Sequence, residues 1–226
     1  MTDTNAPGSP PPAPPSPAPS GNPGSTNPDT RVIHTVLEDG HPVCIRTIRP
    51  GDEGLMRKGI ERMSPQSRYL RFFSGARMPP DWVIDRLLDA DGDRHIAWGA
   101  LDRGPASGRG IAEKAVGSVH AFRDAEHPDC AEFSVAVLDE YHGRGLGKLL
   151  TATILLDALE EGITSFQVDT LGENASAIDF TLSLGGSSHG VGGTTRSFQL
   201  DVAEAVARLR AECDPPGIAK VFAAFD

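Results

Sequence analysis

Three glycines, Gly143, Gly145 and Gly147, follow a β-branched run and lead directly into an apolar, helix-forming segment. Glycine lets the backbone turn sharply and approach another group closely. The first amide N–H groups of the helix that follows have no partners within the helix, and they lie at the positive end of its dipole. Arg144 and Lys148 add positive charge at the same place. The spacing therefore predicts an anion site suited to a pyrophosphate, and hence a nucleotide-like cofactor.

Two arginines upstream could also take part in ligand binding. Arg68 and Arg71 lie in a segment with an aromatic face, residues 67–73. They could line a ligand cleft or form a solvated helix face, and their spacing alone favours the solvated face. Trp82 falls on the apolar face of the next helical pattern, so we expect it in the core rather than as a stacking platform.

The three cysteines, Cys44, Cys130 and Cys213, are odd in number and far apart. Their spacing matches neither a zinc site nor a disulfide framework. We therefore expect reduced thiols and no metal site. Cys130 is the obvious candidate for a covalent nucleophile, but no residue beside it has the character of a partner base.

Composition divides the chain into three parts. The first thirty residues contain ten of the nineteen prolines, with Ala, Ser, Gly and Asn filling most of the remainder. Such a segment cannot bury a core, so residues 1–30 are expected to form a disordered tail that favours polyproline II. Residues 31–212 then make one domain of ordinary size, and residues 213–226 form a C-terminal extension.

Net charge and hydropathy exclude several function classes. The formal net charge of −10 argues against a nucleic-acid partner, which would need a concentrated basic face. No segment approaches the roughly 18 apolar residues that span a bilayer, and the amino terminus lacks a signal-peptide pattern. We expect a cytoplasmic protein with no membrane partner, and the sequence leaves its oligomeric state open.

The elements that must position the glycine loop can be predicted from periodicity and turn residues. A hairpin is expected over residues 35–37 and 43–48, and Asp52 is a plausible N-cap for the helix that follows and runs to Met63. Ser64 and Pro65 repeat the start signal for a second helix. The later elements are strands at 95–101, 115–122 and 131–138, a helix at 144–161, a strand at 163–170, a helix at 174–184, a hairpin at 187–191 and 194–200, and a helix at 202–210.

This order excludes two common nucleotide-binding folds. A Rossmann domain alternates strands and helices from the start, with its glycine turn after the first strand. Here the loop comes late, after an antiparallel meander. A P-loop would close with Gly-Lys-Ser/Thr, whereas Leu149 follows Lys148 and supplies no hydroxyl for magnesium.

The segment from Val135 to Leu150, with His142 followed by Gly145 and Gly147 between a strand and a long helix, resembles the acetyl-CoA pyrophosphate loop of the Gcn5-related N-acetyltransferases, the GNAT family. The family pattern usually starts with Gln or Arg, where this sequence has His142. The segment from residue 174 to 186 resembles the second family signature, in which an Asn faces the pantetheine arm. Asn174 could therefore reach the ligand, or it could cap its own helix.

Two positions depart from the second signature. Gly186 replaces the usual Phe. Thr181 stands where the family often has a Tyr that acts as general acid toward the departing thiolate, so the general acid is left unassigned.

A narrower likeness lies upstream, where residues 48–52 and 63–73 resemble the acetyltransferase domain of bacterial protein lysine acetyltransferases, the group that modifies acyl-CoA synthetases. The resemblance implies acetyl-CoA as cosubstrate. It also implies an α+β (mixed α/β) GNAT fold, with a central, mostly antiparallel twisted sheet of about seven strands flanked by helices. The implied acceptor is a reactive lysine of a partner protein, such as an acyl-CoA synthetase.

The resemblance also assigns the cosubstrate site. Val135, Ala136 and Val137 would offer backbone groups to the pantetheine amides, as an added strand would. A backbone N–H near Val135 would polarise the thioester carbonyl. The pyrophosphate would lie against His142, Gly143, Arg144, Gly145, Leu146, Gly147 and Lys148.

Acyl transfer to an amine needs a base, because a lysine side chain with a pKa of about 10.4 is almost wholly charged at neutral pH. Glu132 stands where protein acetyltransferases of this type place a glutamate. A strand glutamate taken at random would point to water, but its position and the resemblance together favour Glu132 as general base. Partial burial beside apolar neighbours would improve it as a base. Glu126 and His127, in the preceding loop, are second choices, although a solvated turn is the simpler interpretation of that loop.

Three hypotheses for function follow. The leading one is an acetyl-CoA-dependent protein lysine acetyltransferase that works by direct attack in a ternary complex. A small-molecule amine acetyltransferase is the alternative within the same class. A catalytically weak acetyl-CoA-binding regulatory module is the alternative from another class, and it is suggested by His142, Thr181 and Gly186.

Overall fold

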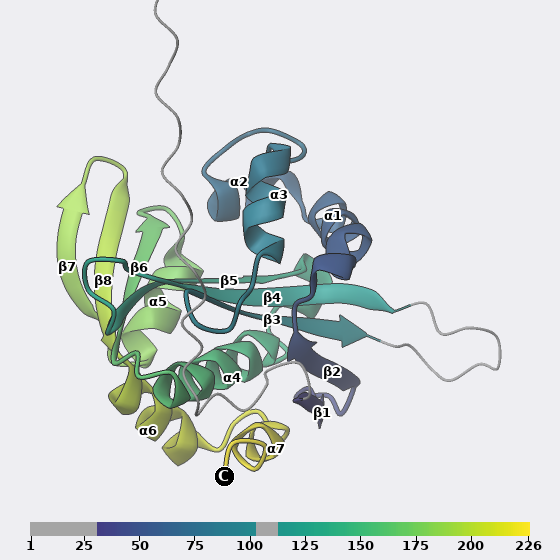
Figure 1. Cartoon of the computed structure of the whole chain (residues 1–226), viewed down its shortest axis with the longest axis vertical. Helices are drawn as coiled ribbons and strands as arrows, with labels where there is room; N and C mark the ends of the chain where they lie inside the picture. Colours follow the sequence, from purple (N-terminus) through teal and green to yellow (C-terminus); the bar gives the residue numbers. More distant parts are fainter. Residues whose placement is uncertain (1–30, 103–112) are drawn as a thin grey trace, which may run out of the picture.

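A computed structural model describes residues 31–102 and 113–226, which form an eight-stranded sheet with helices on both faces (Figure 1). The strand order is β1-β2-β3-β4-β5-β6-β8-β7, and β5 and β6 are its only parallel neighbours. The expected mixed α/β class and mostly antiparallel sheet are confirmed, with eight strands rather than about seven. The proline-rich segment 1–30, expected to be disordered, lies outside the described residues.

The strands are β1 Val32–Val36, β2 Pro42–Thr47, β3 His95–Asp102, β4 Lys114–Arg123, β5 Cys130–Val137, β6 Ser165–Leu171, β7 Ser187–Gly192 and β8 Thr195–Asp201. The α-helices are α1 Glu53–Arg62, α2 Pro65–Phe72, α3 Asp81–Leu88, α4 Leu146–Glu160, α5 Ala175–Ser183, α6 Val202–Glu212 and α7 Ile218–Phe222. Two short 3-10 helices, η2 Pro50–Asp52 and η3 Asp139–Tyr141, precede α1 and the glycine loop.

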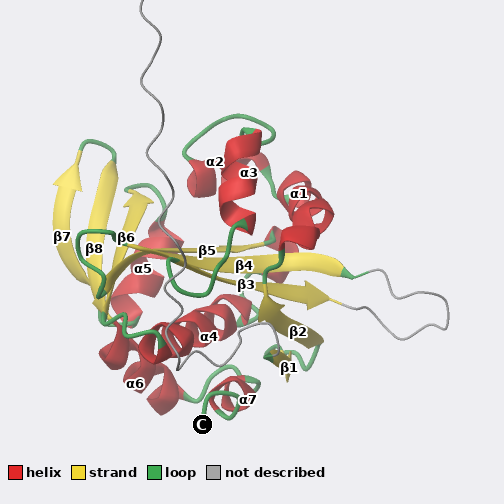
Figure 2. Cartoon of the chain, viewed as in Figure 1, coloured by secondary structure: helices red, strands yellow, loops and turns green. Residues whose placement is uncertain are grey.

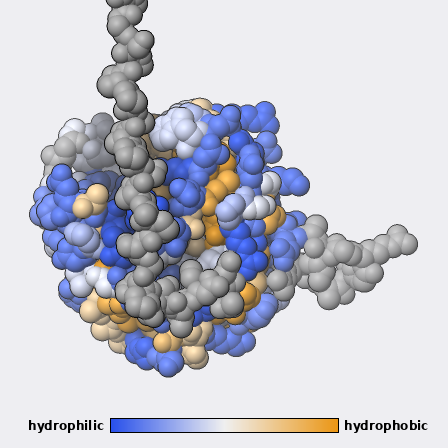
Figure 3. Space-filling model, viewed as in Figure 1, coloured by the Kyte–Doolittle hydropathy of each residue, from blue (hydrophilic) through white to orange (hydrophobic). Residues whose placement is uncertain are grey.

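The helices divide between the two faces of the sheet. Helices α1, α2 and α3 lie on one face, and α4, α6 and α7 lie on the other (Figure 2). The outer surface in the same view is mainly hydrophilic, with a smaller hydrophobic area beside α3 (Figure 3). None of the described helices combines the length and the apolar character needed to cross a bilayer.

Helix α4 forms the centre of the core because it is apolar on nearly every side. A helix of that kind must be covered all round. It contacts β3, β4 and β5 on one side, and α6 and α7 on the other. The buried residues of α7, Ile218, Val221 and Phe222, belong to the same hydrophobic cluster as Leu149 and Leu150 of α4. The C-terminal extension after residue 212 therefore packs on the core of the domain.

The helix starts follow the expected signals with two exceptions. The Ser64 hydroxyl accepts from the Ser67 amide and Pro65 opens α2, as predicted. Asp52 occupies the N-cap position of α1, as predicted, but its side chain accepts from no amide of that helix. It pairs with Arg46 at 2.7 Å instead. Helix α4 begins at Leu146 rather than at Arg144, because Gly145 adopts a φ of 80°.

Trp82, expected in the core, is 66 % exposed on α3. The apolar residues that α3 does bury are Ile84, Leu87 and Leu88. Because helical periodicity gives the apolar stripe but not its width, a residue at the edge of the stripe can lie outside the core.

Candidate active site

Strands β5 and β6 separate after a short parallel contact. Their paired positions run only from Cys130 with Ser165 to Glu132 with Gln167. Beyond Glu132, no strand among the described residues pairs with the edge of β5 that faces β6, so this edge is open to an extended ligand. A cleft of about 810 Å³ lies at this separation and is lined by α2, β5, the glycine loop, β6 and α5.

The structure brings most of the predicted site residues together in this cleft. Those that line it are Glu132, Val135, Ala136, Val137, His142, Gly143, Gly145, Leu146, Gly147 and Asn174. Arg144 and Lys148 are not among the residues that line it. Cys130, the rival nucleophile, is a free thiol and also lies outside the lining.

The glycine loop has the backbone that an anion site requires. Gly143 and Gly145 have φ values of 66° and 80°, a conformation that strains other residues. Gly145 is the N-cap residue of α4 and has no side chain, so it forms no side-chain hydrogen bond with the first amides of the helix. A Cβ at Gly147 would meet no atom within 4 Å, which leaves the backbone open to the cleft. Pyrophosphate oxygens fit such a helix start.

The two cations of the loop turn away from this site. Arg144 pairs with Asp39 at 2.7 Å, in the turn between β1 and β2. Lys148 pairs with Glu212 at 2.8 Å and with Asp214 at 3.1 Å, at the end of α6 and beyond it. The structure therefore does not bring these two side chains to the cleft, and their role in phosphate binding stays a prediction.

His142 fixes the end of β5. Its Nε2 lies 2.9 Å from the Val137 carbonyl oxygen. Because a carbonyl can only accept, the imidazole donates there through Nε2–H. The ring thus ties the glycine loop to the last residue of the strand.

Glu132 lies at the opposite end of the cleft from the glycine loop. Its side chain is 62 % exposed, and the nearest cation is the Arg86 guanidinium, 4.0 Å away on α3. The predicted partial burial of Glu132 is therefore wrong. Glu126 and His127 lie in a surface turn where their amides donate to Asp124, and neither residue lines the cleft.

Asp139 holds helix α2 against the cleft. Its carboxylate accepts from the Ser64 amide at 3.0 Å, and from the Ser64 and Ser67 hydroxyls at 2.7 Å each. Burial acts to raise the pKa of Asp139, but these hydrogen bonds outweigh it and lower the pKa to about 2. The loop after β5 and the start of α2 are thereby held as one unit.

Arg71 is a cleft residue that the sequence analysis placed on a solvated face, and that expectation is wrong. It lines the cleft, and its Nη2 donates to the Ser134 hydroxyl on β5 at 2.9 Å. Burial lowers its pKa to about 10. The sequence carries no local signal that separates Arg71 from Arg68 on the same helix.

Helix α5 explains the two departures from the second signature. Asn174 caps α5 by accepting from the Ala177 amide at 3.3 Å while also lining the cleft. The Thr181 hydroxyl donates to the Ala177 carbonyl at 2.8 Å and is 4 % exposed, so no tyrosine-like acid is offered here. A Cβ at Gly186 would lie 2.6 Å from Thr181 Cγ2, which leaves no room for the usual phenylalanine.

Two of the curated proteins that are similar in sequence have modest identity to this chain. An acetyltransferase of Pseudomonas aeruginosa is 28 % identical over 140 residues, which cover 62 % of this chain and 72 % of the relative. The acetyltransferase Pat of Mycolicibacterium smegmatis is 25 % identical over 138 residues. That match covers 61 % of this chain and 39 % of Pat, so this chain spans well under half of the length of that relative.

Structure comparison and a family model agree with these relatives. The crystal structure of the GNAT domain of PAT from S. lividans is similar with a TM-score of 0.68 at 23 % identity. The match covers 77 % of this chain and 98 % of that domain, and it supports the fold. The family model described as the acetyltransferase (GNAT) family matches residues 69–185, just over half of the chain. The cleft, the glycine loop and this match agree, and the chain belongs to the acetyltransferase (GNAT) family, whose cosubstrate is acetyl-CoA.

Proposed function

We propose that this N-acetyltransferase transfers the acetyl group of acetyl-CoA to the ε-amine of a lysine in a partner protein, such as an acyl-CoA synthetase. The observation that carries the proposal is Glu132, which reaches the cleft immediately where β5 and β6 separate. Two relatives named Pat, and the resemblance of residues 48–52 and 63–73 to protein lysine acetyltransferases, support the acceptor class.

The residues of the cleft fit acetyl-CoA. The open edge of β5 after Glu132 can pair with the two amides of the pantetheine arm. The uncapped start of α4 can hold the pyrophosphate at the other end of the strand. The cosubstrate supplies a thioester, an activated acyl group with a thiolate leaving group. Asn174 and the backbone of residues 135–137 would orient it.

Glu132 would act as the general base. Its exposed carboxylate can accept a proton from an incoming ammonium group, directly or through one water, and release a neutral amine for attack. Direct attack within a ternary complex needs no protein nucleophile, in agreement with the position of Cys130 outside the cleft.

A protein acceptor is favoured by the surface of α2 and α3. Tyr69, Phe73 and Trp82 are 39 %, 49 % and 66 % exposed, and Phe73 also lines the cleft. Exposed aromatic side chains are enriched where proteins bind each other. A small amine would need no such surface outside the cleft.

The proposal can be tested by measuring thiol release from acetyl-CoA with purified acyl-CoA synthetases and with a panel of free amines. We expect turnover on a folded protein, with acetyl-lysine found by mass spectrometry at one or a few positions. Turnover on free amines alone would contradict the protein acceptor. Tight acetyl-CoA binding with no turnover on any acceptor would favour the regulatory-module hypothesis instead.

A further inference from the structure

Arg71 is the residue of the cleft that the proposed function leaves without a role. It is the only lysine or arginine among the described residues that line the cleft. Its Nη2 donates to the Ser134 hydroxyl at 2.9 Å. In the part of the chain that the structure describes, no carboxylate lies within 4.0 Å of its guanidinium to form an ion pair.

The arginines around it have partners of their own. Arg46 pairs with Asp52 at 2.7 Å, and Arg57 pairs with Asp81 at 2.8 Å. Arg62 pairs with Glu140, and Arg68 donates to the Met63 carbonyl at 2.7 Å. Arg71 differs because its one direct partner is a neutral hydroxyl, and the Glu132 carboxylate acts on its charge only from beyond ion-pair distance. A cation withdrawn from water without a counter-ion is unfavourable unless an anion completes its surroundings.

The neighbouring strand adds no negative charge. His120 pairs with Ser134 across β4 and β5. Burial, and then the charge of Arg71, lower the pKa of His120 well below its usual value. The imidazole is therefore neutral at pH 7, and it leaves the positive charge of Arg71 uncompensated on the β4 side.

The position of Arg71 indicates which part of the cosubstrate it would contact. Ser134 is two residues beyond Glu132 on β5, so both side chains lie on the same face of the strand. Ser134 is also past the last pair of β5 with β6. The pyrophosphate site lies at the other end of the strand, beyond Val137. The negative charge that Arg71 would meet is therefore the charge that develops on the reacting acyl group.

We propose that Arg71 is a further catalytic residue, which donates to the carbonyl oxygen of the bound thioester as negative charge develops on it. The inference rests on the proposed function, because it takes the acyl group to lie at the Glu132 end of the cleft. Ser134 would hold the guanidinium in place for this contact. A strand N–H would be the second donor to the same oxygen.

The reaction balances with the groups named. The lone pair of the neutral amine forms the new C–N bond while the carbonyl π pair moves onto oxygen, where Arg71 meets the charge. When the carbonyl bond forms again, the C–S bond breaks and CoA leaves as thiolate. Glu132 gives the proton taken from the ammonium group to solvent before the attack. The second proton, lost by the nitrogen after the attack, passes through Glu132 to the thiolate, which gives the N-acetylated amine and free CoA.

The test uses the full chain as wild type and as Arg71→Gln, with acetyl-CoA carrying ¹³C at the carbonyl. Infrared difference spectra should show the bound carbonyl stretch at lower frequency than in free acetyl-CoA for the wild type. In Arg71→Gln most of that shift should disappear while acetyl-CoA affinity is retained. With the protein acceptor, kcat should fall by about 10²- to 10³-fold, the size seen when one oxyanion donor is removed.

Two variants control for folding and charge. Arg71→Lys should keep part of the carbonyl shift and part of kcat. Arg68→Gln removes an arginine one turn away that contacts Met63 rather than the cleft, and it should keep the wild-type carbonyl band and kcat.

An unchanged carbonyl band together with an unchanged kcat in Arg71→Gln would overturn the assignment. A loss confined to acetyl-CoA affinity would overturn it as well, because Arg71 would then be a binding residue. Failure of the wild type to acetylate any acceptor would contradict the proposed function, whereas the carbonyl band would still decide the contact between Arg71 and the thioester.

Discussion

Two oppositely charged side chains, Glu132 and Arg71, line the end of the cleft where we propose that acyl transfer takes place. The sequence indicated Glu132 through its position three residues before Val135 in a recognisable strand and loop. It could not indicate Arg71, because the same helix carries Arg68, and local spacing does not show which arginine faces the sheet. That choice is made by tertiary packing, through the contact of Arg71 with Ser134.

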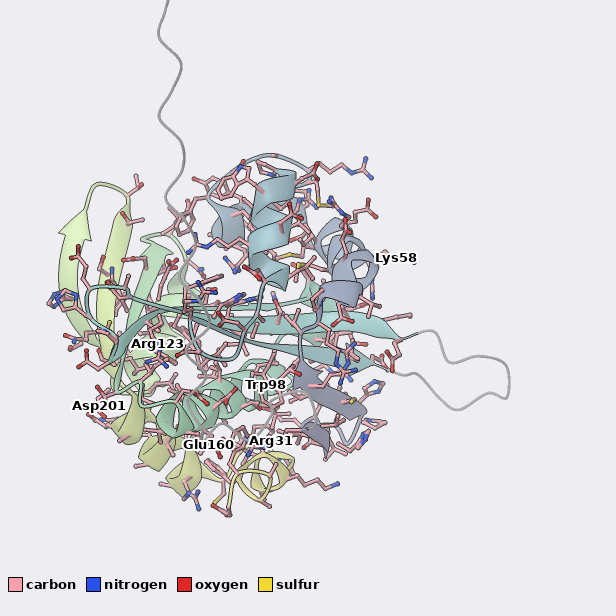
Figure 4. The ribbon with its side chains drawn as sticks, viewed as in Figure 1. Arg31, Lys58, Trp98, Arg123, Glu160 and Asp201 are labelled. Atoms are coloured by element: carbon pink, nitrogen blue, oxygen red, sulfur yellow. The ribbon has the colours of Figure 1, made fainter. Side chains whose placement is uncertain are left out.

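A buried carboxylate in α4 gives a test at the scale of one residue. Asp157 accepts from the Trp98 indole N–H at 2.6 Å, and Trp98 lies beside α4 (Figure 4). Burial raises the pKa of Asp157 to about 6, despite the opposing effect of this hydrogen bond. The usual pKa is 3.8. The contribution of Asp157 to stability is therefore full below about pH 4 and is lost as pH rises through about 6.

Asp157→Asn should raise the free energy of unfolding at pH 8 by about 1–3 kcal/mol, because the amide oxygen still accepts from Trp98 and no charge is buried. At pH 4 the gain should nearly vanish. Urea unfolding at the two pH values measures the difference. Asp157→Leu is the matched control, since it leaves the indole N–H without a partner and should destabilise at both. An equal gain for Asp157→Asn at both pH values would contradict the assignment.

At the scale of elements, the site is made by the separation of β5 from β6 and by the start of α4. Both elements were predicted from local patterns, because β-branched residues, glycines and a long apolar helix are local signals. The separation itself was implied only by the family resemblance. Strand β6 pairs with β8 along its whole length but with β5 only over its first three residues, and such long-range pairing has no local signal.

Two glycines of the loop should respond differently to alanine. At Gly147 a Cβ meets no atom within 4 Å, so Gly147→Ala should keep or slightly raise stability, by about 0.5–1 kcal/mol for a helix position. It should weaken acetyl-CoA binding by about tenfold or more (about 1.4 kcal/mol), because the methyl group occupies the approach to the pyrophosphate. Calorimetric titration and thermal unfolding measure the two effects.

Gly145→Ala is the comparison. It combines a φ of 80° with a Cβ 2.7 Å from Pro215, and it should lower stability by about 1–2 kcal/mol or more. Wild-type acetyl-CoA affinity in Gly147→Ala would contradict the loop as the phosphate site. Unchanged stability in Gly145→Ala would contradict the packing of the C-terminal segment on the loop.

At the scale of the whole molecule, distant segments converge behind the glycine loop. Arg144 reaches Asp39, 105 positions earlier in the chain. Lys148 reaches Glu212 and Asp214 near the C-terminus. The sequence predicted that both cations would support the anion site because they adjoin it in the chain. In the structure both side chains pair with carboxylates from distant parts of the chain instead, and no local pattern contains that information.

Lys148→Gln tests this arrangement. Because Lys148 is partly exposed and bound to carboxylates outside the cleft, its loss should lower stability by less than about 1 kcal/mol. The affinity for acetyl-CoA should stay within about threefold, or about 0.7 kcal/mol. Calorimetric titration at constant ionic strength measures the affinity. A tenfold loss would show that Lys148 leaves its carboxylates to bind the cosubstrate.

We propose that Glu132 removes the proton of an amine bound in the cleft between β5 and β6. The most direct test of this step is single-turnover acetyl transfer at saturating acetyl-CoA, with Glu132→Gln compared with Glu126→Gln, a glutamate of the preceding surface turn. We expect a fall of about 10²- to 10⁴-fold for Glu132→Gln, with unchanged acetyl-CoA affinity, and wild-type transfer for Glu126→Gln. A wild-type transfer rate in Glu132→Gln would rule out Glu132 as the base.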